Sequence, residues 1–182
     1  MNILDIAENS VRAQATLVEI LLEQDTGRQR QVLTIRDNGK GMDAEMVLQV
    51  TDPFCTTRTT RKVGLGLPFL KMAAEMTNGS LHIESTPGKG TAVIASFALN
   101  HIDLAPLGDM PATISALAQT NPDIDFVYRL TRDGATFIFD TREAKELLGE
   151  VRLSEPSVAL FIRDYVEEQT REILDPKAPA QE

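Results

Sequence analysis

Two polar residues near the start of the chain have the types and spacing that metal chemistry needs. Asp5 and Asn9 are four residues apart in DIAENS, so a helix would bring both side chains to one face. The amide oxygen of Asn9 can ligate a hard cation such as Mg²⁺, and Asp5 could orient a water molecule one turn away. A capped surface helix with ordinary polar residues explains the same pattern, and this motif alone favours that simpler interpretation.

The motif DNGKGM at residues 37–42 combines one carboxylate with two glycines. A buried Asp37 at the end of a strand can accept the exocyclic amine of adenine in a charge-assisted hydrogen bond. Gly39 and Gly41 have no side chains, so the base can lie against their backbone. Asn-Gly is also one of the best hairpin-turn dipeptides, whereas the following GKGMDAEM is typical of a helix entry. Both interpretations remain open.

Residues 51–66 form a segment without apolar periodicity that ends in the pattern GLGLP. We expect a long loop, and long loops in compact domains are usually functional lids or disordered. Glycines that lead into a helix expose amide hydrogens at the positive end of the helix dipole, which suits phosphate. The predicted phosphate-binding residues of this pattern are Gly64, Leu65, Gly66 and Leu67.

The lid also contains the only basic cluster of the chain, Arg58, Arg61 and Lys62. These side chains could reach the terminal phosphates of a nucleotide, and we expect Arg58 and Lys62 to bind the nucleotide. A flexible basic loop is the alternative.

A Gly-rich hairpin, TPGKGTAVIASFAL, contains the last candidate residue. Thr91 follows its turn and could place a hydroxyl near the adenine. A simple hairpin is the better explanation of this motif when it is taken alone.

Composition excludes several classes of protein. The chain has 182 residues, 18 basic and 27 acidic, and a net charge of −9, which opposes binding to nucleic acid. One cysteine excludes an internal disulfide and, with two histidines, makes a Cys/His zinc site implausible. We find neither a signal peptide nor a membrane-spanning apolar run, so we expect a cytoplasmic protein without membrane contact.

The elements that must position these residues follow from apolar periodicity. We predict helices at about 3–13, 43–50 and 67–77 and strands at about 16–24, 31–36, 80–85 and 91–99. This order indicates an α+β sandwich with helices on one face of a mixed, mostly antiparallel sheet. Beyond a connector at 100–110 we predict a helix at 111–120, a hairpin at 125–140 that turns at Asp133–Gly134, and helices at 142–148 and 156–174. We therefore expect a first domain at 1–99, a small α+β C-terminal extension at 100–174 and a disordered tail at 175–182.

Together the four motifs resemble the GHKL superfamily, which includes DNA gyrase, a heat-shock chaperone, histidine kinases and MutL. DIAENSVRA is similar to the N box, DNGKGM to the G1 box, DPF at 52–54 to the F box and GLGL at 64–67 to the G2 box. The resemblance covers about residues 1–99 and implies a Bergerat-type two-layer α/β sandwich that binds ATP and Mg²⁺. It implies that Asn9 is the Mg²⁺ ligand, Asp37 the adenine acceptor and Gly39 and Gly41 the G1 glycines. It further implies that Gly64 and Gly66 wrap the phosphates.

The whole chain also resembles stand-alone histidine-kinase-like ATP-binding proteins of anaerobic bacteria that are encoded near iron-only hydrogenase genes. This resemblance rests on three sequence segments, TDPFCTTRTTRKVGLGLP, HIDLAPLGDM and NPDIDFVY.

The sequence departs from the superfamily pattern in three ways. Asp5 occupies the place where hydrolysing members usually have Glu, which puts hydrolysis in doubt. The N box begins at the N-terminus, so we expect an unpaired sheet edge that a partner chain, including a second copy in a homodimer, could complete. No phosphoacceptor helix precedes the N box.

These departures leave two functions open. The first is a protein kinase that acts in trans, in which Asp5 or Glu8 helps to activate the acceptor. The second is a non-catalytic, ATP-dependent switch. In either case we expect a protein partner to bind through the lid or the C-terminal extension.

Overall fold

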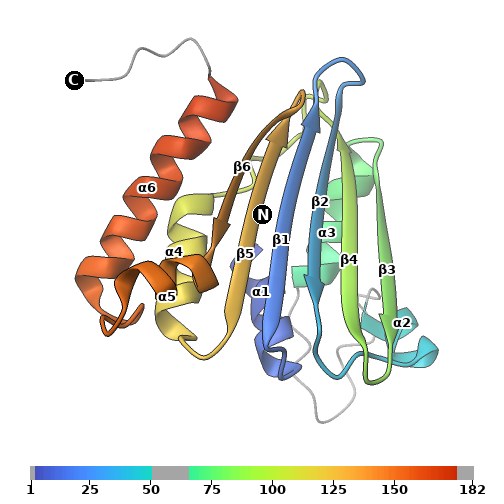
Figure 1. Ribbon diagram of the computed structural model, residues 1–182. Helices are drawn as coiled ribbons and strands as arrows, with labels where there is room; N and C mark the ends of the chain where they lie inside the picture. The colour runs from blue at the N-terminus through green and yellow to red at the C-terminus, as the bar shows by residue number, and fades with distance from the viewer. Residues whose placement is uncertain (1–2, 51–65, 176–182) are drawn as a thin grey trace.

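The computed structural model describes residues 3–50 and 66–175, and every structural statement below concerns these ranges (Figure 1). The helices are α1 (Ile3–Arg12), α2 (Ala44–Val50), α3 (Gly66–Met76), α4 (Met110–Thr120), α5 (Thr141–Leu148) and α6 (Pro156–Leu174). The strands are β1 (Leu17–Asp25), β2 (Arg30–Asp37), β3 (Ser80–Thr86), β4 (Gly90–Ala98), β5 (Asp125–Arg132) and β6 (Ala135–Asp140). The predicted elements are therefore all present, and their ends differ by at most one residue.

The six strands form one sheet in the order β3-β4-β2-β1-β5-β6. All neighbours are antiparallel except β1 and β5, which are parallel. Along β1 the side chains of Val18, Ile20 and Leu22 are buried, as the alternating sequence predicts. The mixed sheet confirms the predicted α+β class.

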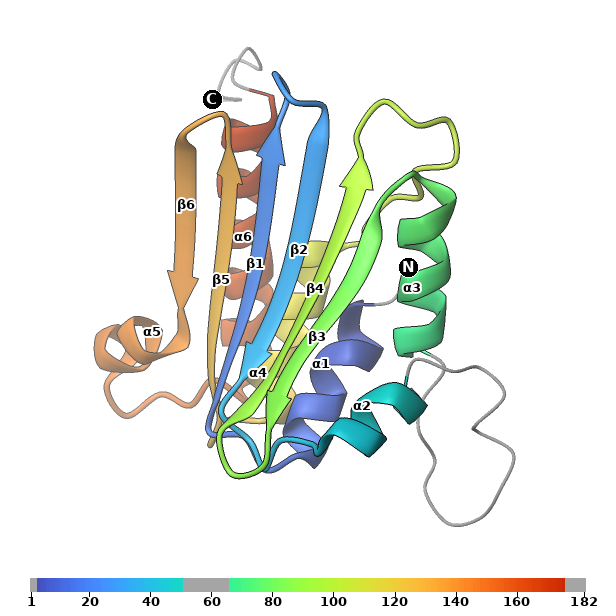
Figure 2. The same ribbon diagram turned by 90° about the vertical axis from the view of Figure 1, so that its right-hand side faces the viewer.

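Helices α1, α3 and α4 cover one face of this sheet (Figures 1 and 2), and α6 packs against α4. Their apolar sides meet the sheet in a single core. Fully buried members of that core include Ile3, Ala7, Ile20, Leu33, Leu70, Ile114, Leu117, Tyr128 and Val166. Because this core contains residues on both sides of position 99, the expected extension shares its hydrophobic core with the first 99 residues.

The first strand, β1, has a neighbour on each side, so the expected unpaired edge does not lie beside it. Strand β5 pairs with β1 in parallel, from Leu17 opposite Asp125 to Gln24 opposite Arg132. Hydrogen bonds just beyond the ends of β1 and β5 reinforce this pair of strands. Here Asp133 accepts from the backbone N–H and from the hydroxyl of Thr26. These bonds lower the pKa of the Asp133 carboxyl. The C-terminal region thus completes the sheet, whose outer strands are β3 and β6.

Caps and turns lie at the ends of the helices and strands where the local sequence predicts them. Asp43 caps α2 by accepting from the N–H of Met46 at 2.8 Å. At the end of α3, Asn78 has a φ of 56° and the N–H of Gly79 donates to the carbonyl of Ala74. The β5–β6 hairpin turns at Asp133–Gly134. Within the described ranges, none of the helices has the length and apolarity that crossing a membrane requires.

Candidate functional site

A cavity of about 440 Å³ opens between α1, α2, α3 and the ends of β2 and β4. These elements meet at the lower end of the sheet in Figure 1. The lining residues are Ile6, Asn9, Ser10, Arg12, Ala13, Ile35, Asp37, Lys40, Gly41, Met42, Met46, Val50, Leu67, Thr91 and Val93. The volume lies within the range of small-molecule sites, and mostly apolar walls with a few polar groups are typical of them.

Asp37 is the anionic group of this cavity and is held in place from two sides. The hydroxyl of Ser10 donates to Oδ2 at 2.8 Å, and the N–H of Gly39 donates to Oδ1 at 2.8 Å. Each carboxylate oxygen can accept a second hydrogen bond. Asp37 is therefore an oriented acceptor with remaining capacity for an amine donor.

Asn9 lies next to Ser10 on α1 and also lines the cavity, where its side chain is half-buried. The same helix thus supplies an amide beside the carboxylate. The walls around them carry apolar side chains that suit a planar aromatic ring. These are Ile35, Met42, Met46, Val50, Leu67 and Val93.

The glycines of the DNGKGM motif are required by packing within the protein. Gly41 has a φ of 65°, and a Cβ there would collide with the carbonyl oxygen of Thr86. A Cβ on Gly39 would lie 2.7 Å from the carbonyl oxygen of Ala13. Gly41 lines the cavity, whereas Gly39 lies behind Asp37 and contributes its N–H. Close approach of backbone to backbone therefore explains these glycines without a ligand.

Thr91 stands opposite Asp37 in the β2–β4 pair and lines the cavity. Its hydroxyl lies 2.8 Å from the Oγ of Ser85. Ser85 also accepts from the N–H of Met42 at 2.8 Å. Ser85 therefore ties the turn after β2 to the β3–β4 hairpin, a role that the sequence did not reveal.

The Asn-Gly pair of this motif does not make a hairpin. The side-chain oxygen of Asn38 accepts from the N–H groups of Thr16 and Leu17 at 2.9 and 3.0 Å, and its amide donates to the hydroxyl of Thr16. Asn38 thus fixes the beginning of β1 beside the end of β2, and the chain continues into α2. The helix-entry interpretation is confirmed.

Two cationic side chains outside the predicted site residues, Arg12 and Lys40, lie on the cavity wall. Arg12 is one turn beyond Asn9 and its guanidinium is 3.2 Å from the carboxylate of Glu8. Lys40 is held through its backbone, which donates to Ala13 and accepts from Gly88. The spacing of Arg12 from Asn9 was the available signal, because residues three apart share a helix face.

The remaining predicted residues divide into two groups. Asp5 is exposed and neither it nor Glu8 lines the cavity. Gly66 begins α3, close to Asp5 and Ile6. Arg58, Lys62, Gly64 and Leu65 lie outside the described residues, as do the predicted lid and the end of the tail.

Replacing Ser10 with Ala should raise the dissociation constant for a ligand bound by Asp37 by about 10-fold, because one hydrogen bond to a charged group is lost. Calorimetric titration of both proteins with Mg·ATP would measure this change. Ser80→Ala is the matched control, since the hydroxyl of Ser80 bonds Ser96 on the sheet and lies outside the cavity lining. Equal affinities of the Ser10 variant and wild type would show that this hydroxyl does not orient Asp37 for binding.

Comparison with known proteins agrees with this geometry. Residues 2–101 match the sequence profile of the histidine kinase-, DNA gyrase B-, and HSP90-like ATPase family. Sporulation kinase D of Bacillus subtilis (strain 168) is 31% identical over 91 residues, which are 50% of this chain and 18% of that protein. The sensor protein SrrB of Staphylococcus aureus (strain NCTC 8325 / PS 47) is 34% identical over 95 residues, which are 50% of this chain and 16% of that protein. The chain thus matches less than a fifth of the length of these curated relatives.

A solved structure shares the fold. The crystal structure of the N-terminal domain of a DNA repair protein overlaps with a TM-score of 0.53 at 18% identity, over 75% of this chain and 50% of that one. The cavity sits between elements inside the matched region, which contains Asn9, Asp37 and Thr91. The chain belongs to the family of histidine kinase-, DNA gyrase B-, and HSP90-like ATPases.

Proposed function

We propose that this protein binds Mg·ATP in the cavity around Asp37 and transfers a phosphoryl group to a separate acceptor protein. One observation carries the proposal: Ser10 and Gly39 hold the Asp37 carboxylate at an apolar cavity of about 440 Å³ that Asn9 also lines. Membership of an ATPase family supports the ligand. The name of one relative, a sporulation kinase, supports the reaction.

The residues present fit this ligand. Asp37 would accept the exocyclic amine of adenine while the apolar walls cover the faces of the base. Asn9 would ligate Mg²⁺ through its amide oxygen, and Arg12 and Lys40 would approach the phosphates. When bound, Mg²⁺ neutralises charge on the phosphates, and such reactions depend mainly on positioning and electrostatics.

Of the two carboxylates proposed to activate the acceptor, Asp5 is the one without an ion pair among the described residues. The carboxylate of Glu8 is engaged by Arg12 at 3.2 Å. Asp5 is exposed on the same helix, and no ion pair involves it among the described residues. We propose that Asp5 takes the proton of the acceptor side chain.

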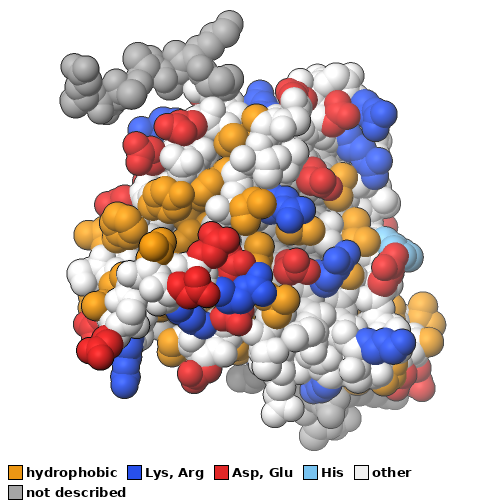
Figure 3. Space-filling model, in the orientation of Figure 1, with side chains coloured by type: hydrophobic (Ala, Val, Ile, Leu, Met, Phe, Trp, Pro, Cys, Tyr) orange, Lys and Arg blue, Asp and Glu red, His pale blue; other side chains and the backbone are white. Residues whose placement is uncertain are grey.

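We propose that the acceptor protein docks on the C-terminal part of the chain. A groove of about 340 Å³ lies between β6, α5 and α6. Its apolar side chains are unusually exposed, with 89% of Leu147 and 67% of Phe161 accessible. Phe161 stacks on Tyr165 with ring centroids 6.3 Å apart. Figure 3 shows hydrophobic side chains gathered where α6 passes β6, and large exposed apolar patches mark interaction sites.

A non-catalytic nucleotide switch is the second candidate. It is favoured by the position of Asp5, which is exposed and does not line the cavity. In this case ATP binding would change the affinity for a partner without phosphoryl transfer.

Asn9→Ala should weaken nucleotide binding about 10-fold when Mg²⁺ is present and leave it nearly unchanged in EDTA, because the lost amide contacts only the metal. Titration with ATP under both conditions measures the difference. Gln14→Ala, an exposed amide just beyond α1, is the control. Equal weakening with and without Mg²⁺ would contradict the metal role of Asn9.

Transfer itself is tested by incubating the protein and a cell extract with ATP labelled at the γ-phosphate. We expect one protein of the extract to become labelled when the wild-type chain is added, and to stay unlabelled when the Asp37→Asn variant is added instead. ATP binding without any labelled protein would favour the switch, and absence of ATP binding would overturn both functions.

A further inference from the structure

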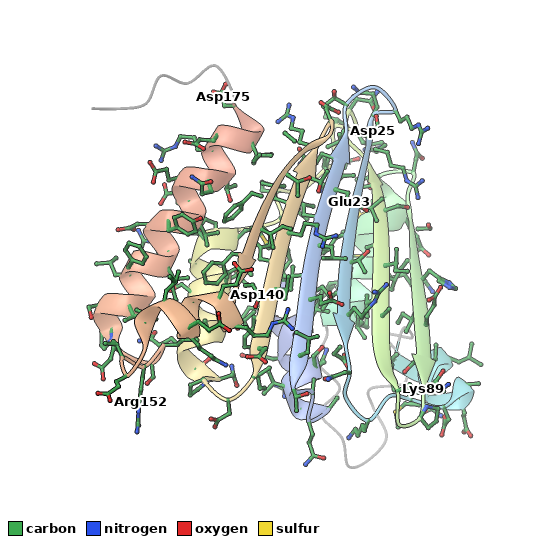
Figure 4. All side chains as sticks on the ribbon, viewed as in Figure 1. Glu23, Asp25, Lys89, Asp140, Arg152 and Asp175 are labelled. Atoms are coloured by element: carbon green, nitrogen blue, oxygen red, sulfur yellow. The ribbon has the colours of Figure 1, made fainter. Side chains whose placement is uncertain are left out.

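The groove between β6, α5 and α6 lies along an outer edge of the sheet. Strand β6 is outermost in the strand order, and three consecutive residues of it, Ile138, Phe139 and Asp140, line the groove. Successive side chains of a strand point to opposite faces, so a groove lined by consecutive residues follows the edge of the strand. In Figure 4, the labelled Asp140 marks the end of β6, where the chain turns into α5.

This edge lacks the features that usually keep an outer strand from pairing with another chain. An edge strand leaves a row of backbone N–H and C=O groups unpaired, and charged side chains or prolines commonly protect it. Strand β6 has the sequence ATFIFD, without proline and without a charge before its last residue. The other outer strand, β3, has His82 and Glu84 at exposed positions. Of the two outer strands, β6 is therefore the one that can accept a further strand.

Apolar side chains from all three elements are exposed in the groove. Ile138 of β6 is 48% accessible, and Leu147 of α5 and Phe161 of α6 are more exposed still. Tyr165 lines the groove beside them and packs edge-to-face on Phe137, with ring centroids 5.7 Å apart. A strand added beside β6 would direct every second side chain toward the two helices. The groove therefore fits an extended segment with apolar residues at alternate positions.

The charges around the groove are negative. Its lining contains Asp140 and Glu143 and has no lysine, arginine or histidine. Arg142 engages the carboxylate of Asp140 at 2.6 Å, whereas Glu143 is exposed and has no ion pair among the described residues. Glu168, three residues beyond Tyr165 and on the same side of α6, is exposed in the same way. Lysine or arginine in the bound segment would complement these carboxylates.

A second copy of this chain matches the groove poorly. The chain has a net charge of −9, and a symmetric dimer through this edge would bring the carboxylates of two grooves together. Like charges that face each other across an interface oppose association. The charge therefore favours a basic segment of a different protein.

We infer that the acceptor protein binds this groove through an extended segment that has apolar side chains at alternate positions and lysine or arginine beside them. The backbone of the segment adds a strand to β6, its apolar side chains contact Leu147 and Phe161, and its cations lie near Glu143. This inference rests on the proposed function for the identity of the partner, whereas the binding itself requires no nucleotide.

The test uses a peptide of about ten residues in which valine alternates with lysine, long enough to span the six residues of β6. The peptide is titrated into the full chain in EDTA without nucleotide, and nuclear magnetic resonance follows the backbone amides. We expect a dissociation constant on the order of 100 µM and slower hydrogen exchange at the amides of β6. The same peptide with glutamate in place of lysine should not bind.

Two matched pairs of variants separate the groove from the rest of an acidic surface. Leu147→Ala should weaken peptide binding about 5-fold and Glu143→Gln about 3-fold, because each removes a side chain that lines the groove. Leu160→Ala and Glu146→Gln are the controls, since both positions are exposed on the same two helices and lie outside the lining. Both controls should bind the peptide as wild type does.

Three results would overturn the inference: equal affinity of all four variants, binding of the peptide without protection of the β6 amides, or a dimer of the chain that covers the groove. The proposed nucleotide site is tested separately by titration with Mg·ATP. A chain that binds Mg·ATP but not the peptide would overturn the inference and leave the nucleotide site standing. A chain that binds the peptide but not Mg·ATP would do the reverse.

Discussion

Replacing Asp37 with Asn is expected to raise the dissociation constant for Mg·ATP by about 100-fold while the protein stays folded. The variant loses the charge that strengthens the bond to the adenine amine, a contribution of about 1.5–3 kcal/mol. It also turns an NH₂ group toward the cavity or toward Ser10, where the carboxylate only accepts hydrogen bonds. The fold is retained because the amide oxygen can still accept from the N–H of Gly39.

Calorimetric titration with ATP and GTP measures the change in affinity, because guanine has a carbonyl oxygen at the position where adenine has the 6-amino group that Asp37 would accept. Asp43→Asn is the control: it makes the same chemical change at the cap of α2, where Asn serves equally well, and Asp43 does not line the cavity. We expect wild-type affinity for that control. If Asp37→Asn bound ATP as tightly as wild type, Asp37 would not be the adenine acceptor.

Gly41→Ala is expected to destabilise the protein by about 3–5 kcal/mol. Gly41 has a φ of 65°, which costs an L-residue about 1–2 kcal/mol. The added Cβ would in addition collide with the carbonyl oxygen of Thr86. To relieve the collision, the turn after β2 must move away from the β3–β4 hairpin, which threatens the bonds from Gly88 to Lys40 and from Met42 to Ser85.

Urea unfolding gives the free energy of unfolding of Gly41→Ala and Gly88→Ala. Comparing the two separates the cost of backbone strain from the cost of the steric clash with Thr86. Gly88 has a similar φ of 75°, but no atom lies within 4 Å of the position its Cβ would take. Gly88→Ala should therefore lose only about 1 kcal/mol. Equal losses in the two variants would mean that the contact between the turn and the hairpin contributes nothing.

The elements could be predicted from the sequence because their signals are local. Alternation marks β1, Asp43 marks the start of α2 and Asp133–Gly134 marks the last hairpin. The partner of β1 could not be predicted in the same way. A parallel pair has no connecting turn, and β5 begins 100 residues after the end of β1 at Asp25. An unpaired edge was therefore the natural expectation, although β5 fills it.

The residues of the candidate site could likewise be predicted from the sequence only in part. Asn9, Asp37 and Thr91 belong to recognisable motifs, and the structure brings all three to one cavity. Ser10 and Ser85 were missed because their hydrogen bonds join positions 27 and 43 residues apart, to Asp37 and Met42 respectively. A serine has no pattern that announces such a distant partner.

The sequence identifies Gly39 and Gly41 as important, but it reveals only part of the reason why glycine is needed there. Sequence reasoning assigned Gly39 and Gly41 to the approach of a base, whereas the folded chain needs both for contacts with Ala13 and Thr86. A motif can therefore be intact for packing even where no ligand binds. For this reason binding must be tested at Asp37, whose hydrogen-bonding capacity the fold leaves only partly used.

The most direct test of the account is a crystal structure of the protein with Mg²⁺ and a non-hydrolysable ATP analogue. We predict that the base fills the cavity between α1, α2 and β4, with its exocyclic amine within hydrogen-bonding distance of the Asp37 carboxylate and the metal on the amide oxygen of Asn9. A nucleotide bound with its base away from Asp37, or bound elsewhere on the protein, would contradict it.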